Sequence, residues 1–317
     1  MPQAAWRSRS HLRAETSSLA RLDWELRTGR YVSVTRDALL PATVSDDLWQ
    51  RSGAALSTQH PGALISRRTA AVLHEFPWLP DCWPHERICV EAPPDDTTRS
   101  SREGIDRRLC FVPPVDATDL DGLRITSIAR TAVDLARHEP RDLVVPILDG
   151  LLTEGRTTTP ELLAVLAGMR RVRQVRVARD LVGQARAGVG SPRETHMRLR
   201  IVDAGLPEPD TNLLIQEDGI TLAQGDLGYW RWLIWIEYDG REPHEELRIN
   251  GADQTKDRWL RRRGWVVMRL TNRDYYRPGT FLRELQDEIR DAPMRIAALR
   301  SSRSPEVAAA RLALGLT

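Results

Sequence analysis

Three acidic residues near the C-terminal end of the chain have the types and spacing that metal chemistry requires. Asp226 is followed by Glu237 and Asp239, and the second and third of these lie in the largely apolar run 231–240. Such a run predicts a strand buried on both faces, and residues two apart on a strand point to the same side. Ionised carboxylates there are costly unless a positive charge meets them. We therefore expect a divalent metal site, which favours hydrolysis of phosphate esters.

Glu194 is a further acidic candidate for the same site. It lies in the first turn of a helix predicted to begin at Ser191 and to end at Gly205. On that helix it shares a stripe with Met197 and Ile201, which would turn it inward. The spacing from Ser191 to Glu194 is also that of a capping box, in which the glutamate binds the backbone N–H of Ser191. The two interpretations are compatible with each other.

His244 and Lys256 are the candidates for proton transfer and charge stabilisation. His244 can act as a general base or acid near neutral pH, or it is an exposed loop residue. Lys256 is the only lysine in the chain and lies on a helix predicted to start at Asp253. Asp239 either contributes to the site or begins a turn before Gly240.

A group of arginines follows the same predicted helix, and we consider it a candidate surface for nucleic acid. Arginines near a helix C-terminus also interact favourably with the helix dipole, which would account for about half of them. The remainder can grip a phosphate backbone. The group comprises Arg258, Arg261, Arg262, Arg263 and, on the next predicted strand, Arg269.

Length and composition limit the class of protein. The 317 residues suffice for two or three domains, and a net charge of +2 gives no overall attraction to nucleic acid or membrane. The three cysteines form no CxxC motif, so we expect a reducing, cytoplasmic location rather than a disulfide framework. The N-terminus lacks the features of a signal peptide, and no apolar stretch approaches the roughly 20 residues that cross a bilayer.

Alternating strand and helix patterns predict an α/β (α+β) chain of several parts. Residues 1–55 read as a mainly helical unit, either a degenerate winged helix or a small capping unit. Residues 60–186 read as a small α+β region that ends in a basic helix over 170–186. Residues 191–292 read as a mixed sheet flanked by helices, with a strand over 232–238, and 293–317 as a helical tail.

The order of elements in 191–292, with one acid on an early strand and a Glu-x-Asp on the next, resembles the PD-(D/E)xK restriction-endonuclease-like fold. More narrowly, it is similar to the very-short-patch-repair endonuclease-like domain. The matching residues lie over about 100 positions in the right order: Ser191–Glu194, Arg198, Ala204–Pro207, Pro209, Gly225–Leu227, Ile236–Gly240, His244, Asp257, Arg258, Leu260, Gly264, Trp265 and Val267–Leu270.

This resemblance implies a metal-dependent DNA endonuclease or nickase that uses one or two magnesium or manganese ions and no small organic cofactor. Asp226 and Glu237 would hold the metal. The usual lysine two residues after the second acid is replaced by Asp239. Either Lys256 supplies that charge from the following helix, or His244 takes over, as in the repair-endonuclease-like branch.

The region upstream resembles abortive-infection-type antitoxin proteins found in actinobacteria. The residues that carry this resemblance are Leu64–Ser66, Ala70, Ala71, Leu73, His74 and Ile125–Asp134. It implies DNA as a partner and a toxin–antitoxin or defence context, although the glycine- and tyrosine-containing wing expected over 35–40 is absent. The alternatives to an enzyme are therefore a non-catalytic DNA-binding regulator with a degenerate nuclease-like domain, and an interaction scaffold.

Overall fold

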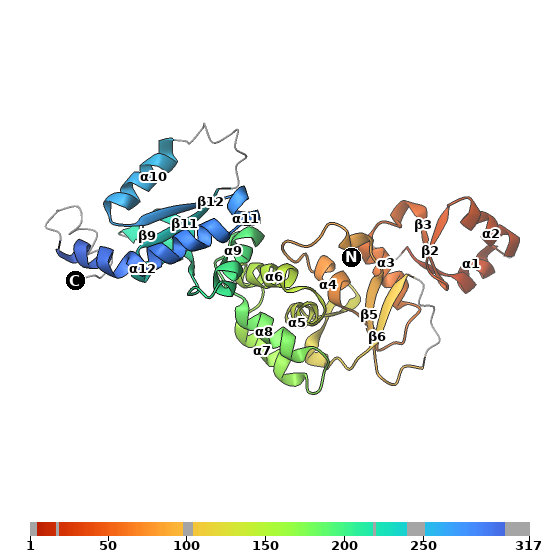
Figure 1. Ribbon diagram of the computed structural model, residues 1–317. Coiled ribbons are helices and arrows are strands. Elements are labelled where there is room, and N and C mark those ends of the chain that lie inside the picture. The colour runs from red at the N-terminus through yellow and green to blue at the C-terminus, as the bar shows by residue number, and fades with distance from the viewer. Residues whose placement is uncertain (1–4, 17–18, 98–103, 218–219, 240–250, 302–317) are drawn as a thin grey trace. The chain divides into compact units, whose positions relative to one another are not determined.

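The computed structural model describes residues 5–16, 19–97, 104–217, 220–239 and 251–301 (Figure 1). The chain divides into two compact units, residues 1–185 and 186–317. The expected mixed α/β architecture is confirmed. Within the described residues, no helix is both long and apolar enough to cross a membrane.

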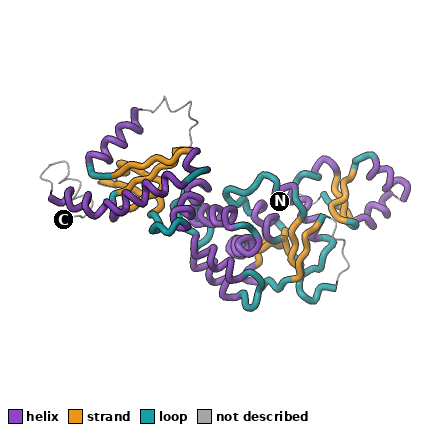
Figure 2. Tube along the Cα trace, viewed as in Figure 1, coloured by secondary structure: helices purple, strands orange, loops and turns teal. Residues whose placement is uncertain are grey.

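The first part of unit 1 contains more strand than the mainly helical unit that the sequence predicts. One strand precedes two helices and two strands follow them (Figure 2). The three strands form an antiparallel sheet of order β1-β3-β2. Trp6 packs on Gly53, where any side chain would collide with the indole ring. The elements are β1 (Arg7–Ser8), α1 (Arg9–Thr16), α2 (Leu19–Arg27), β2 (Tyr31–Thr35), β3 (Ala38–Pro41), η1 (Ala42–Val44) and α3 (Leu48–Leu56).

The rest of unit 1 joins a five-stranded mixed sheet of order β6-β5-β4-β8-β7 to a group of helices. Ser127 caps α5 by accepting the N–H of Arg130, and Thr158 forms a capping box with Glu161 at α7. The elements are β4 (Leu64–Ile65), α4 (Arg67–Leu73), η2 (Trp83–His85), β5 (Ile88–Ala92), β6 (Ile105–Leu109), η3 (Pro114–Asp116), β7 (Ala117–Leu120), β8 (Leu123–Thr126), α5 (Ile128–His138), α6 (Arg141–Thr153), α7 (Thr159–Gly168) and α8 (Val175–Gln184).

Unit 2 is built on a four-stranded mixed sheet of order β12-β11-β10-β9. Strands β9, β10 and β11 are antiparallel neighbours, whereas β11 and β12 are parallel and are joined through α10. The elements are α9 (Pro192–Asp203), β9 (Asp210–Glu217), β10 (Ile220–Tyr229), η4 (Trp230–Trp232), β11 (Ile234–Asp239), α10 (Gly251–Arg262), β12 (Val266–Thr271), α11 (Asn272–Tyr276) and α12 (Gly279–Ser301).

Helices cover both faces of the unit 2 sheet, so the sheet is buried between two cores. On one face, α9 and α12 pack over Leu227 and Ile236; on the other, α10 packs over Trp235. Figure 1 shows α10 and α12 on opposite sides of the sheet. Because side chains alternate along a strand, Glu237 belongs with Trp235 on the α10 side.

Three expected boundaries were wrong, each for a local reason. The central strand begins at Ile234, because Leu233 adopts a positive φ of 55° after the turn of 3₁₀ helix. The basic helix starts at Val175 rather than 170, since Arg171 and Gln174 have positive φ. The tail does not begin at 293: α12 continues through Pro293 to Ser301.

Candidate functional site

Strand register brings the first two predicted acids to the same place in unit 2. Leu227 of β10 pairs with Ile236 of β11, and one step further along these antiparallel strands Asp226 lies beside Glu237. Directly opposed residues of an antiparallel pair lie close together on the same side of the sheet. The two carboxylates therefore meet, as the sequence predicts.

Lys256 reaches this pair from α10. Its Nζ lies 2.6 Å from Oε1 of Glu237, whose side chain is buried, while the lysine itself is about a quarter exposed. Of the two residues that the sequence offered in place of a lysine on this strand, Lys256 therefore lies at Glu237. The contact holds a positive charge at the acids, with one side of the ammonium open to solvent.

Arg269 is part of the same charge cluster rather than a separate surface arginine. The parallel register of β11 and β12 places it beside Glu237, and its Nη2 lies 3.6 Å from the Glu237 carboxylate. The same nitrogen lies 2.8 Å from Asp257 Oδ1, and Nε donates to Oδ2 at 3.3 Å. Asp257 was part of the family resemblance but was not predicted as a site residue.

The residue before the first acid, Gly225, has no room for a side chain. A side chain at this position would run into the indole ring of Trp235. That ring is fully buried, and its Nε1 donates a hydrogen bond of 2.7 Å to Oε1 of Glu237. The glycine therefore makes room for the tryptophan that fixes the orientation of the second acid.

Asp226 is half-buried and is held by the backbone of the neighbouring strand. Its Oδ2 accepts the N–H of Tyr238 at 2.8 Å. Burial raises the pKa of Asp226; this hydrogen bond lowers it, the nearby Glu237 carboxylate raises it, and Lys256 lowers it. Asp226 thus has a raised pKa because burial and like charge outweigh its stabilising partners.

Glu194 caps the start of α9 and lies close enough to Asp226 to feel its charge. Its Oε2 accepts the N–H of Gly190 at 2.9 Å, and its Oε1 accepts the hydroxyl of Ser191 at 2.7 Å. The expected hydrogen bond to the backbone of Ser191 is thus replaced by one to Gly190, one residue earlier. Burial raises the pKa of Glu194, and the Asp226 carboxylate raises it further. The helix start is therefore electrostatically coupled to the acid pair.

The donor set suits a hard divalent cation. Carboxylate oxygens are the ligands that magnesium and manganese prefer, and magnesium often takes one or two carboxylates, with waters completing its shell. Among the described residues, no group of three or more His, Cys, Asp or Glu side chains is arranged to hold a metal ion. A bound cation would offset the crowding of negative charge that raises the pKa values of Asp226 and Glu194.

The last two predicted site residues are Asp239, of which the structure describes the backbone, and His244. The backbone of Asp239 ends β11 opposite Thr271 of β12, next to the site. His244 lies outside the described residues.

The arginines of α10 separate into different environments. Arg258 and Arg262 are exposed. Arg261 donates to the carbonyl of Val267 at 3.1 Å, and the Arg263 guanidinium lies 3.7 Å from the centroid of the Trp259 ring. Arg261 and Arg263 thus have partners within the unit, and contact of any of these arginines with nucleic acid stays a prediction.

Tyr238 is a neighbour of the site that the sequence did not single out. Its hydroxyl donates to Oδ1 of Asn272 at 2.6 Å, and Arg193 of α9 contacts both side chains. Since Tyr238 also donates its N–H to Asp226, this cluster ties α9 and the end of β12 to the acids. A tyrosine after the second acid gave no sequence signal, because its partners are about 35 to 45 residues away.

Comparison with known proteins gives distant relatives and weak structural likeness. No family model matches the chain. Two uncharacterised proteins of Mycobacterium tuberculosis, MT2308 of strain CDC 1551 and Rv2248 of strain H37Rv, are each 28% identical over 179 residues. The match covers 56% of this chain and 61% of each relative. The crystal structure of the RV2827C protein from Mycobacterium tuberculosis gives a TM-score of 0.40 at 16% identity, over 66% of this chain and 78% of that one, and carries no argument.

Proposed function

We propose that unit 2 is a metal-dependent DNA endonuclease or nickase that hydrolyses phosphodiester bonds. The observation that carries the proposal is the 2.6 Å contact of Lys256 with Glu237, next to Asp226. Two acids and a lysine at the end of a sheet form the charge pattern that phosphodiester hydrolysis requires, although they come from three separate elements. A cytoplasmic location and a defence context belong to the same proposal.

The side chains have distinct roles in this proposal. Asp226 and Glu237 hold the cation, and Trp235 keeps the Glu237 carboxylate in place. When bound, magnesium or manganese supplies a water of lowered pKa and offsets charge on the scissile phosphate. Lys256 stabilises negative charge at the same phosphate, because its ammonium is both fixed by Glu237 and partly exposed.

Three further groups extend this arrangement. Glu194 adds negative charge beside Asp226, which strengthens the attraction for a cation. Asp239 and His244 follow Glu237 closely in the chain, as a further oxygen ligand and a proton donor or acceptor, respectively. The exposed Arg258 and Arg262 of α10 would contact the DNA backbone.

Cleavage of supercoiled plasmid tests the proposal. With magnesium or manganese, the full chain should convert supercoiled DNA to open circles or linear DNA, and chelation should stop the reaction. Asp226→Asn should lower the rate by roughly a hundredfold or more, because a ligand carboxylate is lost while the hydrogen bond from Tyr238 can persist.

Asp287→Asn is the matched control. This exposed acid of α12 pairs with Arg290 in the same unit, and its replacement should leave cleavage unchanged. If the folded protein cleaves no DNA with either metal, or if both variants cleave equally well, the nuclease proposal is wrong.

A non-catalytic DNA-binding regulator is the second candidate, and the N-terminal sheet favours it. Two helices followed by the β2–β3 hairpin, with β1 pairing to β3, are compatible with a winged helix. Arg27, Arg30 and Arg36 are exposed on α2, on the turn after it and at the hairpin tip. Exposed arginines around a hairpin are suited to phosphate contacts.

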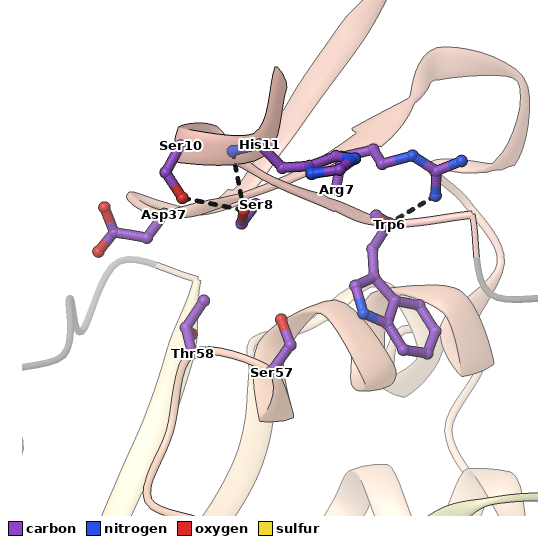
Figure 3. Close-up of a pocket in the computed structure, with 8 residues that line it drawn as sticks. All are labelled: Trp6, Arg7, Ser8, Ser10, His11, Asp37, Ser57 and Thr58. Carbon is purple, nitrogen blue, oxygen red and sulfur yellow. Dashed lines mark hydrogen bonds between the residues drawn. The ribbon is translucent and has the colours of Figure 1, made fainter. Parts of the chain in front are cut away.

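A hollow of about 680 Å³ adjoins this part, between β1 and the end of α3 (Figure 3). Arg7 and His11 line it together with Asp37, Ser57 and Thr58. The side chain of Arg7 donates to the carbonyl of Trp6 at 3.1 Å. The mixed charge of the hollow does not favour a particular ligand, so the regulator proposal relies on the hairpin.

Gel-shift titration distinguishes the two candidates. A regulator should bind double-stranded DNA without metal and lose roughly tenfold affinity for each phosphate contact removed, as in Arg36→Ala. The exposed Arg176 of α8 provides the control, because it lies outside the N-terminal part of the unit. Equal binding by the wild type, Arg36→Ala and Arg176→Ala would contradict recognition by the hairpin.

A further inference from the structure

A second cavity, of about 570 Å³, lies in unit 1 and plays no part in the proposed nuclease chemistry. It is bounded by residues of α4, η2, β5 and β6 and by the C-terminal end of α5. Basic side chains outnumber acidic ones in its lining. They are Arg67, Arg68, Arg87, Arg108, His85 and His138, against Glu86, Asp106 and Glu139.

Two of the arginines are fixed as part of the wall. Arg67 is buried and donates to both the carboxylate and the main-chain carbonyl of Asp106. Arg68 binds Glu139 through two hydrogen bonds of 2.6 and 2.9 Å, and Glu86 through a third of 2.6 Å. These pairs build a rigid, polar wall.

The other two arginines remain available for a ligand. Arg87 is exposed and, among the residues that the structure describes, its guanidinium makes no ion pair or side-chain hydrogen bond. Arg108 is 42% exposed, lies 4.0 Å from Asp106 and contacts the ring of His138 at 2.7 Å. Arg87 therefore has no carboxylate partner among the described residues, and Arg108 has only the 4.0 Å contact with an Asp106 carboxylate that is bound more closely by Arg67.

The acids that line the cavity differ in how readily they can move away. The Glu86 and Asp106 side chains are 36% and 44% exposed, whereas Glu139 is only 6% exposed. An anion that approaches Arg87 and Arg108 therefore leaves Asp106 on Arg67 and Glu86 on Arg68, and the exposed sides of these two carboxylates can shift toward water. Glu139 stays on Arg68 and keeps the wall in place.

His138 adds a neutral hydrogen-bonding group to the cavity. Burial lowers the pKa of His138 to about 4, and the positive charges of Arg108 and Arg137 contribute to the shift. The ring is therefore neutral at physiological pH and can offer one N–H to an anion.

We infer that this cavity binds the terminal phosphate of a small phosphorylated molecule of nucleotide size. The planar, forked guanidinium groups of Arg87 and Arg108 match the oxygens of a phosphate group. The cavity volume lies in the range of small-molecule sites, and its charged lining excludes an apolar ligand.

Calorimetric titration of the full chain tests this inference, with AMP, inorganic phosphate and adenosine as probes. AMP should bind saturably at one site, and adenosine should not bind. Inorganic phosphate should compete with AMP, because the phosphate group provides the recognition. Arg87→Ala and Arg108→Ala should each weaken AMP binding by roughly tenfold to a hundredfold, as expected for one lost charge-assisted hydrogen bond.

Arg176→Ala is the matched control, since this arginine is exposed in the same unit but outside the cavity. It should leave AMP binding unchanged. The inference is overturned if AMP fails to bind the folded protein, if adenosine binds as well as AMP, or if Arg176→Ala weakens AMP binding as much as Arg87→Ala does. Because the site is confined to unit 1, Asp226→Asn should not affect AMP binding, whatever the outcome for DNA cleavage.

Discussion

The two units contain clusters of acids that are built in opposite ways. In unit 1, Arg130 is 2% exposed and lies at the centre of Glu91, Asp116 and Asp134, at 3.5, 3.1 and 2.8 Å. In unit 2, Asp226 is half-buried, and the positive charge beside Glu237 is that of Lys256 on α10, which is partly open to solvent. One cluster surrounds a buried positive charge, whereas the other lies where a ligand can approach.

This difference separates a stabilising network from a candidate reactive site. Acids that surround a buried arginine hold α5, β5 and η3 together, and their cation is already in place. The acids of unit 2 instead meet a lysine that is about a quarter exposed, so their cation is in contact with solvent. Removal of the central cation should therefore destabilise unit 1, whereas removal of a charge from the unit 2 cluster should mainly affect chemistry.

The largest effect should come from Arg130→Met. The change leaves the buried Glu91 and Asp116 carboxylates without their cation, while Asp134 keeps Arg137 at 2.6 Å, and we expect a cost of roughly 3–5 kcal/mol in the free energy of unfolding of unit 1. Hydrogen exchange of the amides of α5 and β5 would measure the loss, with Arg176→Ala as a control. Unchanged exchange would mean that the cluster does not stabilise the unit.

Glu91→Gln should change the pH dependence of the same unit. Burial raises the pKa of Glu91 to about 7, with a further contribution from Asp134, while Arg130 opposes the shift. When an acid has a higher pKa in the folded than in the unfolded state, the folded unit loses stability as the pH rises between the two values. For Glu91 this range runs from about 4.5 to about 7, and the loss is roughly 3 kcal/mol.

Glu91→Gln removes this loss. Relative to the wild type, the variant should gain stability between pH 5 and pH 7, as seen in urea titrations at each pH. The difference isolates Glu91, because His138, whose lowered pKa acts in the opposite direction, is present in both proteins. A constant difference across this range would contradict the prediction.

Lys256→Met should have a smaller effect on stability. Glu237 loses its 2.6 Å partner but keeps Arg269 and the Trp235 N–H, so we expect a cost of roughly 1–2 kcal/mol for unit 2. Thermal unfolding with hydrogen exchange on β11 would measure it. Arg258→Ala, an exposed change on the same helix, should cost less than about 0.5 kcal/mol.

Asp226→Asn should have the smallest effect on stability and, under the nuclease proposal, a large effect on cleavage. Removal of a half-buried charge whose pKa is raised by burial should slightly stabilise unit 2 at neutral pH, because the asparagine carbonyl can still accept the Tyr238 N–H. Thermal unfolding at pH 7 and pH 4 checks the sign, since the gain should fade at low pH. A clear loss of stability at pH 7 would mean that the Asp226 carboxylate has a structural role, like that of the acids around Arg130 in unit 1.

Much of the candidate site could be predicted from local pattern. The apolar run before Glu237 predicts a buried strand, and Ser191 caps α9 as its position predicts. The start of β11 was missed because the left-handed conformation of Leu233 has no strong sequence signal. Tyr238 and Asn272 were missed because their contact depends on strands that meet only in the folded chain.

The sequence alone determined which residues carry charge on an apolar strand, because burial and alternation are properties of a short segment. Only the tertiary structure decided which cation meets those acids. Lys256 lies 19 residues beyond Glu237, and only the packing of α10 over Trp235 brings the two together. The buried cluster around Arg130 was decided in the same way, since its acids come from β5, η3 and α5 and a through-space charge pairing leaves no periodic signal in the chain.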